Sequence, residues 1–151
     1  MLNDKLKLKG RVGIVVKDKD GKIKEKREET NLVVNTGLNY ITSRMKDATA
    51  GVMSHMALGT GTTAAAASDT DVETIAGSRE ALDSGSPTVS TNTINYVCSF
   101  EAGDVTGAIT EAGIFNASSS GTMLCRVVFS ALNLTSTDSI SIDWTITLSA
   151  S

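Results

Sequence analysis

Few residues of this chain could carry out acid–base, nucleophilic or metal chemistry. The chain has one histidine, His55, and two cysteines, Cys98 and Cys125, which are too far apart in the sequence to form a CxxC motif. A structural zinc site needs about four Cys, His or carboxylate ligands at short spacing, and a catalytic triad needs a histidine beside a nucleophile. The sequence therefore predicts a protein that is not an enzyme and that holds no metal ion or other cofactor.

The segment Gly59–Thr63 (GTGTT) has the composition of a phosphate-binding loop. A P-loop needs a lysine followed by Ser or Thr after its second glycine, and a dinucleotide-binding fold needs a third glycine and a helix. Alanines follow this segment instead. We therefore expect its glycines to form a turn at the end of a strand.

Three carboxylates, Glu101, Asp104 and Glu111, lie near the ends of two expected strands. They lack the alternating ligand positions of a calcium loop. Glu111 also stands inside an apolar run, where an unpaired charge would be costly. We expect its carboxylate to accept hydrogen bonds from a neighbouring turn or to pair with Arg126 or Arg79.

The histidine and the cysteines have structural interpretations. His55 stands in an apolar stretch beside Met56, and we expect it to be a structural residue that is exposed or at an interface. Cys98 and Cys125 lie on the apolar faces of their expected strands. The N-terminus lacks the apolar stretch of a signal peptide, which favours synthesis in a reducing cytoplasm and two buried free thiols.

The first thirty residues have the pattern of a charged β-hairpin. Apolar and basic side chains alternate along residues 5–17, which is the period of a half-buried strand. The basic residues on its outer face are Lys5, Lys7, Lys9 and Arg11. A turn follows at Asp20-Gly21, and the charges of residues 22–30 predict a second strand at an exposed edge. The hairpin therefore spans about residues 5–30, and its four outer basic residues are the candidate partner-binding site.

The rest of the chain predicts one helix and several short strands. Residues 36–47 have helical spacing, with Thr36 or Asn35 as the cap. The expected apolar face of this helix is Leu38, Ile41 and Met45. Alternating runs separated by turns, among them residues 88–101, predict an all-β fold, a β-sandwich of about seven to nine antiparallel strands formed by residues 1–151 as one domain. No apolar run approaches the ~20 residues that cross a bilayer, so we expect no membrane partner.

Charge is distributed unevenly along the chain. Residues 1–30 contain ten Lys and Arg against six Asp and Glu, whereas the remainder contains four basic and eleven acidic residues. A basic arm on an acidic body could bind nucleic acid, but these lysines alternate with apolar and acidic residues and do not cluster. We therefore expect the basic face to meet the acidic surface of a neighbouring protein and not a nucleic acid.

Two segments of the chain carry specific motifs. The first is Met56–Thr63 (MALGTGTT), with Asp69 and Glu80 after it, and the second is Gly107–Ala117 (GAITEAGIFNA) followed by Gly121–Arg126 (GTMLCR). They resemble the GTGTT…DT…E stretch and the ITE-x-G-[IL]-F-N-A…GTML-x-R hairpin of a group of tailed-bacteriophage virion proteins.

This resemblance implies a virion structural protein, assembled in the host cytoplasm, with no catalytic residues to transfer. The chain has no repetitive shaft and no coiled-coil heptads, which favours a capsid decoration (cement) protein that binds and stabilises the assembled head. Its expected partners are other virion proteins, namely the major capsid protein or tail and neck proteins. It is expected to form a symmetric homo-oligomer, a trimer or a dimer.

Two alternatives remain open at this point. The chain could be a tail, collar or neck fibre or attachment component of the same kind of particle. It could also be a carbohydrate-binding module that recognises a receptor. Such modules stack sugars on exposed aromatic side chains, whereas Trp144 stands on the apolar side of its expected strand and aromatic residues make up only 4% of the chain.

Overall fold

The computed structural model describes residues 5–46 and 51–150, which form an all-β fold with one helix, as predicted. The elements in chain order are β1 (Leu6–Lys17), β2 (Ile23–Val33), α1 (Asn35–Lys46), β3 (His55–Gly59), β4 (Ile75–Ala81), β5 (Thr88–Ser90), β6 (Thr93–Phe100), β7 (Gly107–Phe115), β8 (Met123–Leu134) and β9 (Ser139–Ala150). Every pairing between these strands is antiparallel.

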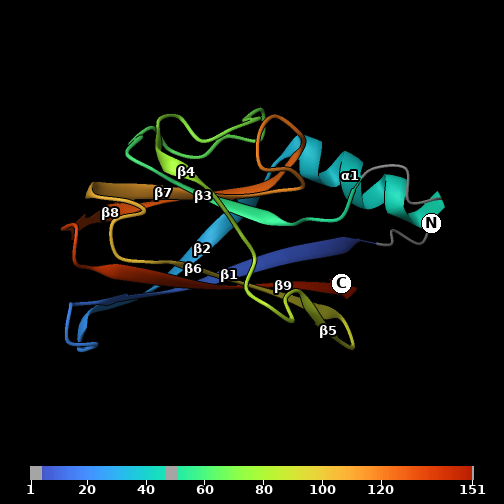
Figure 1. The fold of residues 1–151 in the computed structure, drawn as a ribbon. Coiled ribbons are helices and arrows are strands. Elements are labelled where there is room, and N and C mark those ends of the chain that lie inside the picture. The colour runs from blue at the N-terminus through green and yellow to red at the C-terminus, as the bar shows by residue number, and fades with distance from the viewer. Residues whose placement is uncertain (1–4, 47–50, 151) are drawn as a thin grey trace.

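The nine strands form one sheet that curls over on itself into two layers. Its strand order is β4-β3-β7-β8-β2-β1-β9-β6-β5. In Figure 1 the layer of β1, β9 and β6 lies beneath the layer of β3, β7 and β8, and β2 crosses from one layer to the other. β2 pairs with β1 from Ile23 to Asn31 and with β8 only at Leu32 and Val33. The sandwich is therefore closed on this side by one strand that changes partners.

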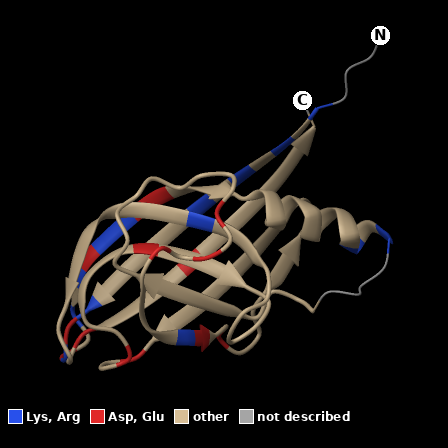
Figure 2. Cartoon of the chain, turned by 90° about the horizontal axis from the view of Figure 1, so that it is seen from above, with Lys and Arg blue, Asp and Glu red and all other residues tan. Residues whose placement is uncertain are grey.

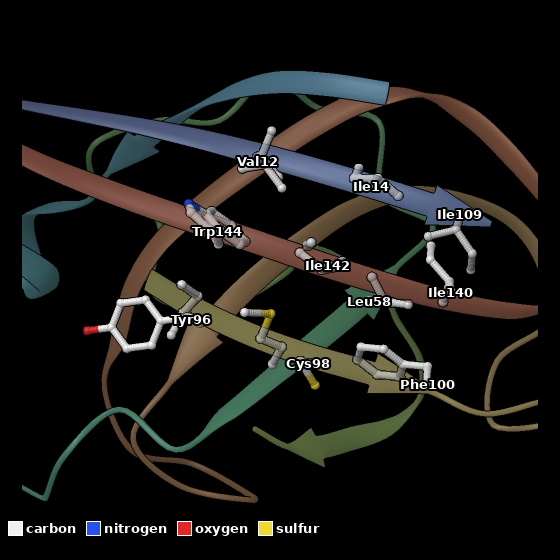
Figure 3. Close-up of a cluster of buried hydrophobic side chains, with 14 of the residues drawn as sticks. Val12, Ile14, Leu58, Tyr96, Cys98, Phe100, Ile109, Ile140, Ile142 and Trp144 are labelled. Carbon is white, nitrogen blue, oxygen red and sulfur yellow. The ribbon is translucent and has the colours of Figure 1, made fainter. Parts of the chain in front are cut away.

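The core fills the space between the two layers. Figure 3 shows side chains from β1, β9 and β6 pointing towards those from β3 and β7. Trp144 is the largest of them and is fully buried, and its indole Nε1 donates to Oδ1 of Asn31 at 3.0 Å. A Cβ on Gly10, the strand neighbour of Asn31, would overlap this amide, so glycine leaves the space that Asn31 needs. The alternation seen in the sequence of β9 therefore does produce one buried face.

The N-terminal hairpin is more deeply built into the sheet than its charges suggested. β1 and β2 pair from Gly10–Asn31 to Lys17–Ile23, which confirms the hairpin. Its first strand is not at an edge, because β1 also pairs with β9 along its whole length. The inner side chains of β1, which include Val12 and Ile14, are buried in the core. Every second side chain of β1 from Val12 to Val16 is buried in the core. The strand therefore lies inside the sheet even though its outer face is charged.

Helix α1 forms where it was predicted, but only Ile41 of the apolar face assigned to it packs against the core. The helix runs from Asn35 to Lys46, and residue 47 lies outside the described residues. Leu38 and Met45 are 41% and 84% exposed. The helix also packs through Gly37, where a Cβ would overlap the carbonyl of Leu124. Close backbone contact at this glycine brings the helix against β8, so that Tyr40 and Ile41 pack against the core while Leu38 and Met45 stay outside.

Two further local expectations need correction. Neither Asn35 nor Thr36 is the cap, since Asn35 is already the first helical residue and the Thr36 hydroxyl donates to the carbonyl of Met123 at 2.9 Å. Residues 88–101 are not one strand but a hairpin of β5 and β6. Thr91 takes a left-handed conformation at the turn, with φ of 55°. The chain reverses there without the glycine that would have marked the turn in the sequence.

Candidate partner-binding face

The four predicted site residues form one row on the outer face of β1. Lys5, Lys7, Lys9 and Arg11 are all exposed, and we call them the basic row. Figure 2 shows blue positions following this strand towards the N-terminal end. The neighbouring residues on β9 are Ser149 opposite Lys7, Thr147 opposite Lys9 and Thr145 opposite Arg11. Small hydroxyl side chains therefore border the row on this side, and they bring no opposite charge.

The Arg11 end of the row carries an ion pair. Arg11 forms an ion pair with Glu28 of β2, and both side chains are more than half exposed. Within the described residues, neither Lys7 nor Lys9 has an ion-pair partner. Exposed charges of this kind contribute little to folding stability. The two lysines are thus available to a partner at small cost to the fold.

The sheet narrows to two strands beside Lys7 and Lys9. β1 pairs with β2 only from Gly10 onwards, so Leu6–Lys9 pairs only with Thr147–Ala150 of β9. We call these two segments the terminal ribbon. Leu6, on the face opposite the lysines, is 63% exposed. The ribbon carries positive charge on one face and uncovered apolar surface on the other.

A second cluster of charges lies inside the other layer, where the two sequence motifs meet. Glu111 of β7 is fully buried, and Arg126 of β8 is 2% exposed. The guanidinium binds Oε2 of Glu111 through Nε at 2.9 Å and through Nη2 at 2.8 Å. The same carboxylate accepts backbone N–H bonds from Gly61, Glu73 and Thr74 at 2.8–2.9 Å. The predictions that Glu111 accepts bonds from a turn and pairs with Arg126 are both confirmed.

Arg126 extends this network to the exposed loop between β3 and β4. Its Nη1 contacts Asp69 at 2.8 Å, and its Nη2 donates to the carbonyl of Thr63 at 3.1 Å. Burial opposes ionisation of Asp69, but the N–H of Ala66 and the Arg126 guanidinium outweigh it and lower the pKa of this carboxyl. Hydrogen bonds from Thr63 lower the pKa of Glu73. We call Glu111, Arg126 and the two loop carboxylates bonded to the arginine, Asp69 and Glu73, the buried network, because its central pair is buried.

The buried network explains the glycines of the GTGTT segment. Gly59 ends β3, and Gly61 follows it into the loop. A Cβ on either glycine would overlap the carboxylate of Glu111. The N–H of Gly61, which a phosphate would have used, binds that carboxylate instead. The segment is therefore a turn that wraps an internal carboxylate, as the absence of a P-loop lysine indicated.

The remaining residues singled out in the sequence have local roles. Ser54 Oγ and Nδ1 of half-buried His55 are 2.8 Å apart. Cys98 and Cys125 are buried free thiols, as predicted. Arg79 does not pair with Glu111 but lies over the ring of Phe115 at 3.5 Å. None of these side chains is joined to the basic row.

An apolar hollow of about 250 Å³ lies between α1 and the ends of β6 and β9. Tyr40, Tyr96 and Leu148 are among its lining residues. Burial and the neighbouring Tyr40 raise the pKa of the Tyr96 hydroxyl. All six aromatic residues of the chain lie in the described part, and only Tyr40 among them is not buried. This distribution argues against a stacking platform for sugars.

Residues 5–46 and 51–150 contain no group of three or more His, Cys, Asp or Glu side chains placed to hold a metal ion. In the same residues, no helix has the length and apolar character needed to span a membrane. The chain matches no family model, no curated protein and no solved structure.

Sequence reasoning found the basic row and the Glu111–Arg126 pair but missed three parts of these sites. Asp69 and Glu73 were not assigned to Arg126, although acidic residues stand at alternate positions from Asp69 to Glu73. No pattern in the sequence indicated that Asn31 accepts the hydrogen bond of the buried Trp144 indole. No pattern indicated that β2 leaves β1 after Asn31, which creates the terminal ribbon.

Proposed function

We propose that this chain is a structural protein of a tailed-bacteriophage virion, and that it decorates the assembled head. The observation that carries the proposal is the basic row, whose Lys7 and Lys9 are exposed on a strand fixed in the core and have no ion-pair partner among the described residues. The two motifs that resemble phage virion proteins support it from another direction. Their charged residues hold the protein's own loop in place, which is a structural role and not a catalytic one.

In this proposal the basic row docks on an acidic surface of a virion protein. A decoration protein buries surface across joints between capsid subunits, and binding to the assembled shell alone adds stability to that state by mass action. The particle's own symmetry makes a cyclic homo-oligomer, a trimer or dimer, the natural form of such a protein. Assembly takes place in the host cytoplasm.

The test is the place of the chain in intact particles. Particles made from the genome that encodes the chain should be purified and studied by quantitative mass spectrometry and by electron microscopy with a labelled antibody. We expect many copies per particle and label over the head. Label confined to the tail or neck would move the proposal to an attachment component, and absence from the particle would contradict it.

A further inference from the structure

The terminal ribbon offers an unpaired strand edge beside its charges. Among residues 5–46 and 51–150, the Leu6–Lys9 part of β1 has a strand partner on one side only, because β2 has already turned towards β8. A strand edge of this kind presents alternate backbone N–H and C=O groups that can pair with another extended segment.

Several other strand edges among the described residues are covered or short. The facing edge of the ribbon is covered by Asn92, which accepts from the N–H of Leu148 at 2.9 Å and donates its side-chain amide to the Leu148 carbonyl at 2.7 Å. The open edge of β2 is bridged to β8 by Arg27, whose Nη1 donates to the Ser130 carbonyl at 2.6 Å. β5, at one end of the sheet, is only three residues long. By contrast, no described residue covers the outer edge of β1 at Leu6–Lys9 in this way.

The two faces of this edge specify what would pair with it. Directly opposite residues in a strand pair share a face, and opposite charges there are favourable whereas like charges are not. Lys7 and Lys9 would therefore lie beside acidic residues of an added strand. Leu6 and half-buried Leu8 on the other face would lie beside apolar residues. The complementary sequence is one in which acidic and apolar residues alternate.

A second copy of this chain does not supply such a strand. Antiparallel pairing of two Leu6–Lys9 edges with their apolar faces together would set lysine opposite lysine. Acidic residues stand at successive alternate positions at Asp18 and Asp20 and from Asp69 to Glu73. Asp18 already accepts the N–H groups of Asp20 and Lys22 in the hairpin turn at 2.9 and 3.0 Å. Asp69 and Glu73 already contact Arg126 at 2.8 and 3.8 Å. The occupant therefore has to be another protein.

We propose that the edge of β1 at Leu6–Lys9 accepts an extended segment of a partner protein, with alternating acidic and apolar residues, as an added β-strand. This deepens the docking role proposed above for the basic row and rests on it, but it does not depend on where in a virion the partner lies. The added strand would complete the sheet at the point where β2 leaves it, and it would cover Leu6.

The test uses the full chain and a capped eight-residue peptide in which glutamate alternates with valine. Isothermal titration calorimetry measures binding, and NMR hydrogen exchange measures the protection of the Lys7–Lys9 amides. We expect saturable binding, new protection at these amides, and a loss of affinity of about tenfold or more in the Lys7→Glu/Lys9→Glu variant. The Lys17→Glu/Lys19→Glu variant has the same change in net charge at the far end of the hairpin and should bind as the original chain does.

Two peptide controls separate strand addition from simple charge attraction. A peptide of the same composition with glutamates and valines in pairs should bind at least roughly tenfold more weakly, because the period of two is lost. In a strand, successive N–H groups point to opposite edges. N-methylation of all valines or of all glutamates therefore blocks one edge each, and only one of the two peptides should lose binding.

Several outcomes would overturn the inference. One is that the alternating peptide fails to bind, and another is that the peptide with paired residues binds with the same affinity. A third is that the two methylated peptides both bind or both fail to bind. The last is that the chain associates with itself and protects the Lys7–Lys9 amides when no peptide is present. None of these results depends on finding the chain in a virion. Conversely, peptide binding by a chain that is absent from particles would keep the strand-addition site and reject the proposed virion role.

Discussion

The two charged regions of this molecule put ion pairs to opposite uses. In the buried network, Glu111 and Arg126 are almost wholly removed from water, and each is bonded to several partners. In the basic row, Arg11 shares its charge with exposed Glu28. Isolated charges are costly to bury, so the first arrangement stands only because its bonds are complete. The second costs little and stabilises little.

This difference indicates which charges shape the fold and which contribute little to it. The buried network fixes the loop between β3 and β4 through backbone groups of Gly61, Thr63, Glu73 and Thr74. A buried ion pair is weak evidence for added stability compared with well-packed apolar side chains. We therefore interpret the network as a device that holds one loop conformation, and the basic row as the part that meets a partner.

The largest expected effect comes from breaking the buried pair. Glu111→Ala leaves the Arg126 guanidinium buried with fewer partners, and we expect a loss of ~3–5 kcal/mol in the free energy of unfolding. The matched change in the exposed pair, Glu28→Ala, should cost no more than about 1 kcal/mol. Urea unfolding of both variants measures the contrast. Equal losses would remove the distinction between the two regions.

A loss of unfolding free energy of similar size is expected when the buried side chain of Trp144 in β9 is removed. Trp144→Ala removes a fully buried ring and leaves the amide of Asn31 without its donor, and we expect a loss of ~3–5 kcal/mol. Thr145→Ala, on the outer face of the same strand, is the control; it removes one hydrogen bond from Asn95 Nδ2 and should cost about 1 kcal/mol. If Trp144→Ala unfolds at the same urea concentration as the original chain, the faces of β9 are assigned the wrong way round.

Acid should destabilise the loop through its carboxylates. The pKa values of Asp69 and Glu73 are lowered in the folded chain by the bonds described above. A lowered folded-state pKa gives stability that is present above the unfolded-state pKa and is lost as pH falls through the folded-state value. We expect the melting temperature to fall as pH drops below about 4, with Asp69→Asn showing a smaller fall. A melting temperature that rises in this range would contradict the sign of these shifts.

The smallest effect is expected from the thiols. Burial, followed by the nearby Asp83 and Glu80, raises the pKa of Cys98 to about 12, and burial raises that of Cys125. The native chain should therefore react slowly with thiol reagents at neutral pH, and a reducing agent should leave its melting temperature unchanged. A fall of many degrees on reduction would show that the two cysteines are bonded to each other.

The sequence predicted those features that depend on local period and on the cost of buried charge. The outward lysines of β1, the buried face of β9 and the pairing of Glu111 follow from these rules. The contact face of α1 did not, because close backbone approach at Gly37 outweighs the apolar pattern of Leu38 and Met45. Nor could local period show that β2 would leave β1 for β8, since this depends on contacts between distant strands.

The most direct test of the account is the reversal of the whole basic row. A variant with Lys5, Lys7, Lys9 and Arg11 changed to glutamate should keep the melting temperature close to that of the original chain, because these side chains are exposed. Its occupancy on purified particles should be much lower, and occupancy by the original chain should fall when salt is raised from about 0.05 to 0.5 M, where charge interactions are screened. Equal occupancy by the two proteins at both salt concentrations would contradict the account and direct attention to the loop from Thr60 to Gly77.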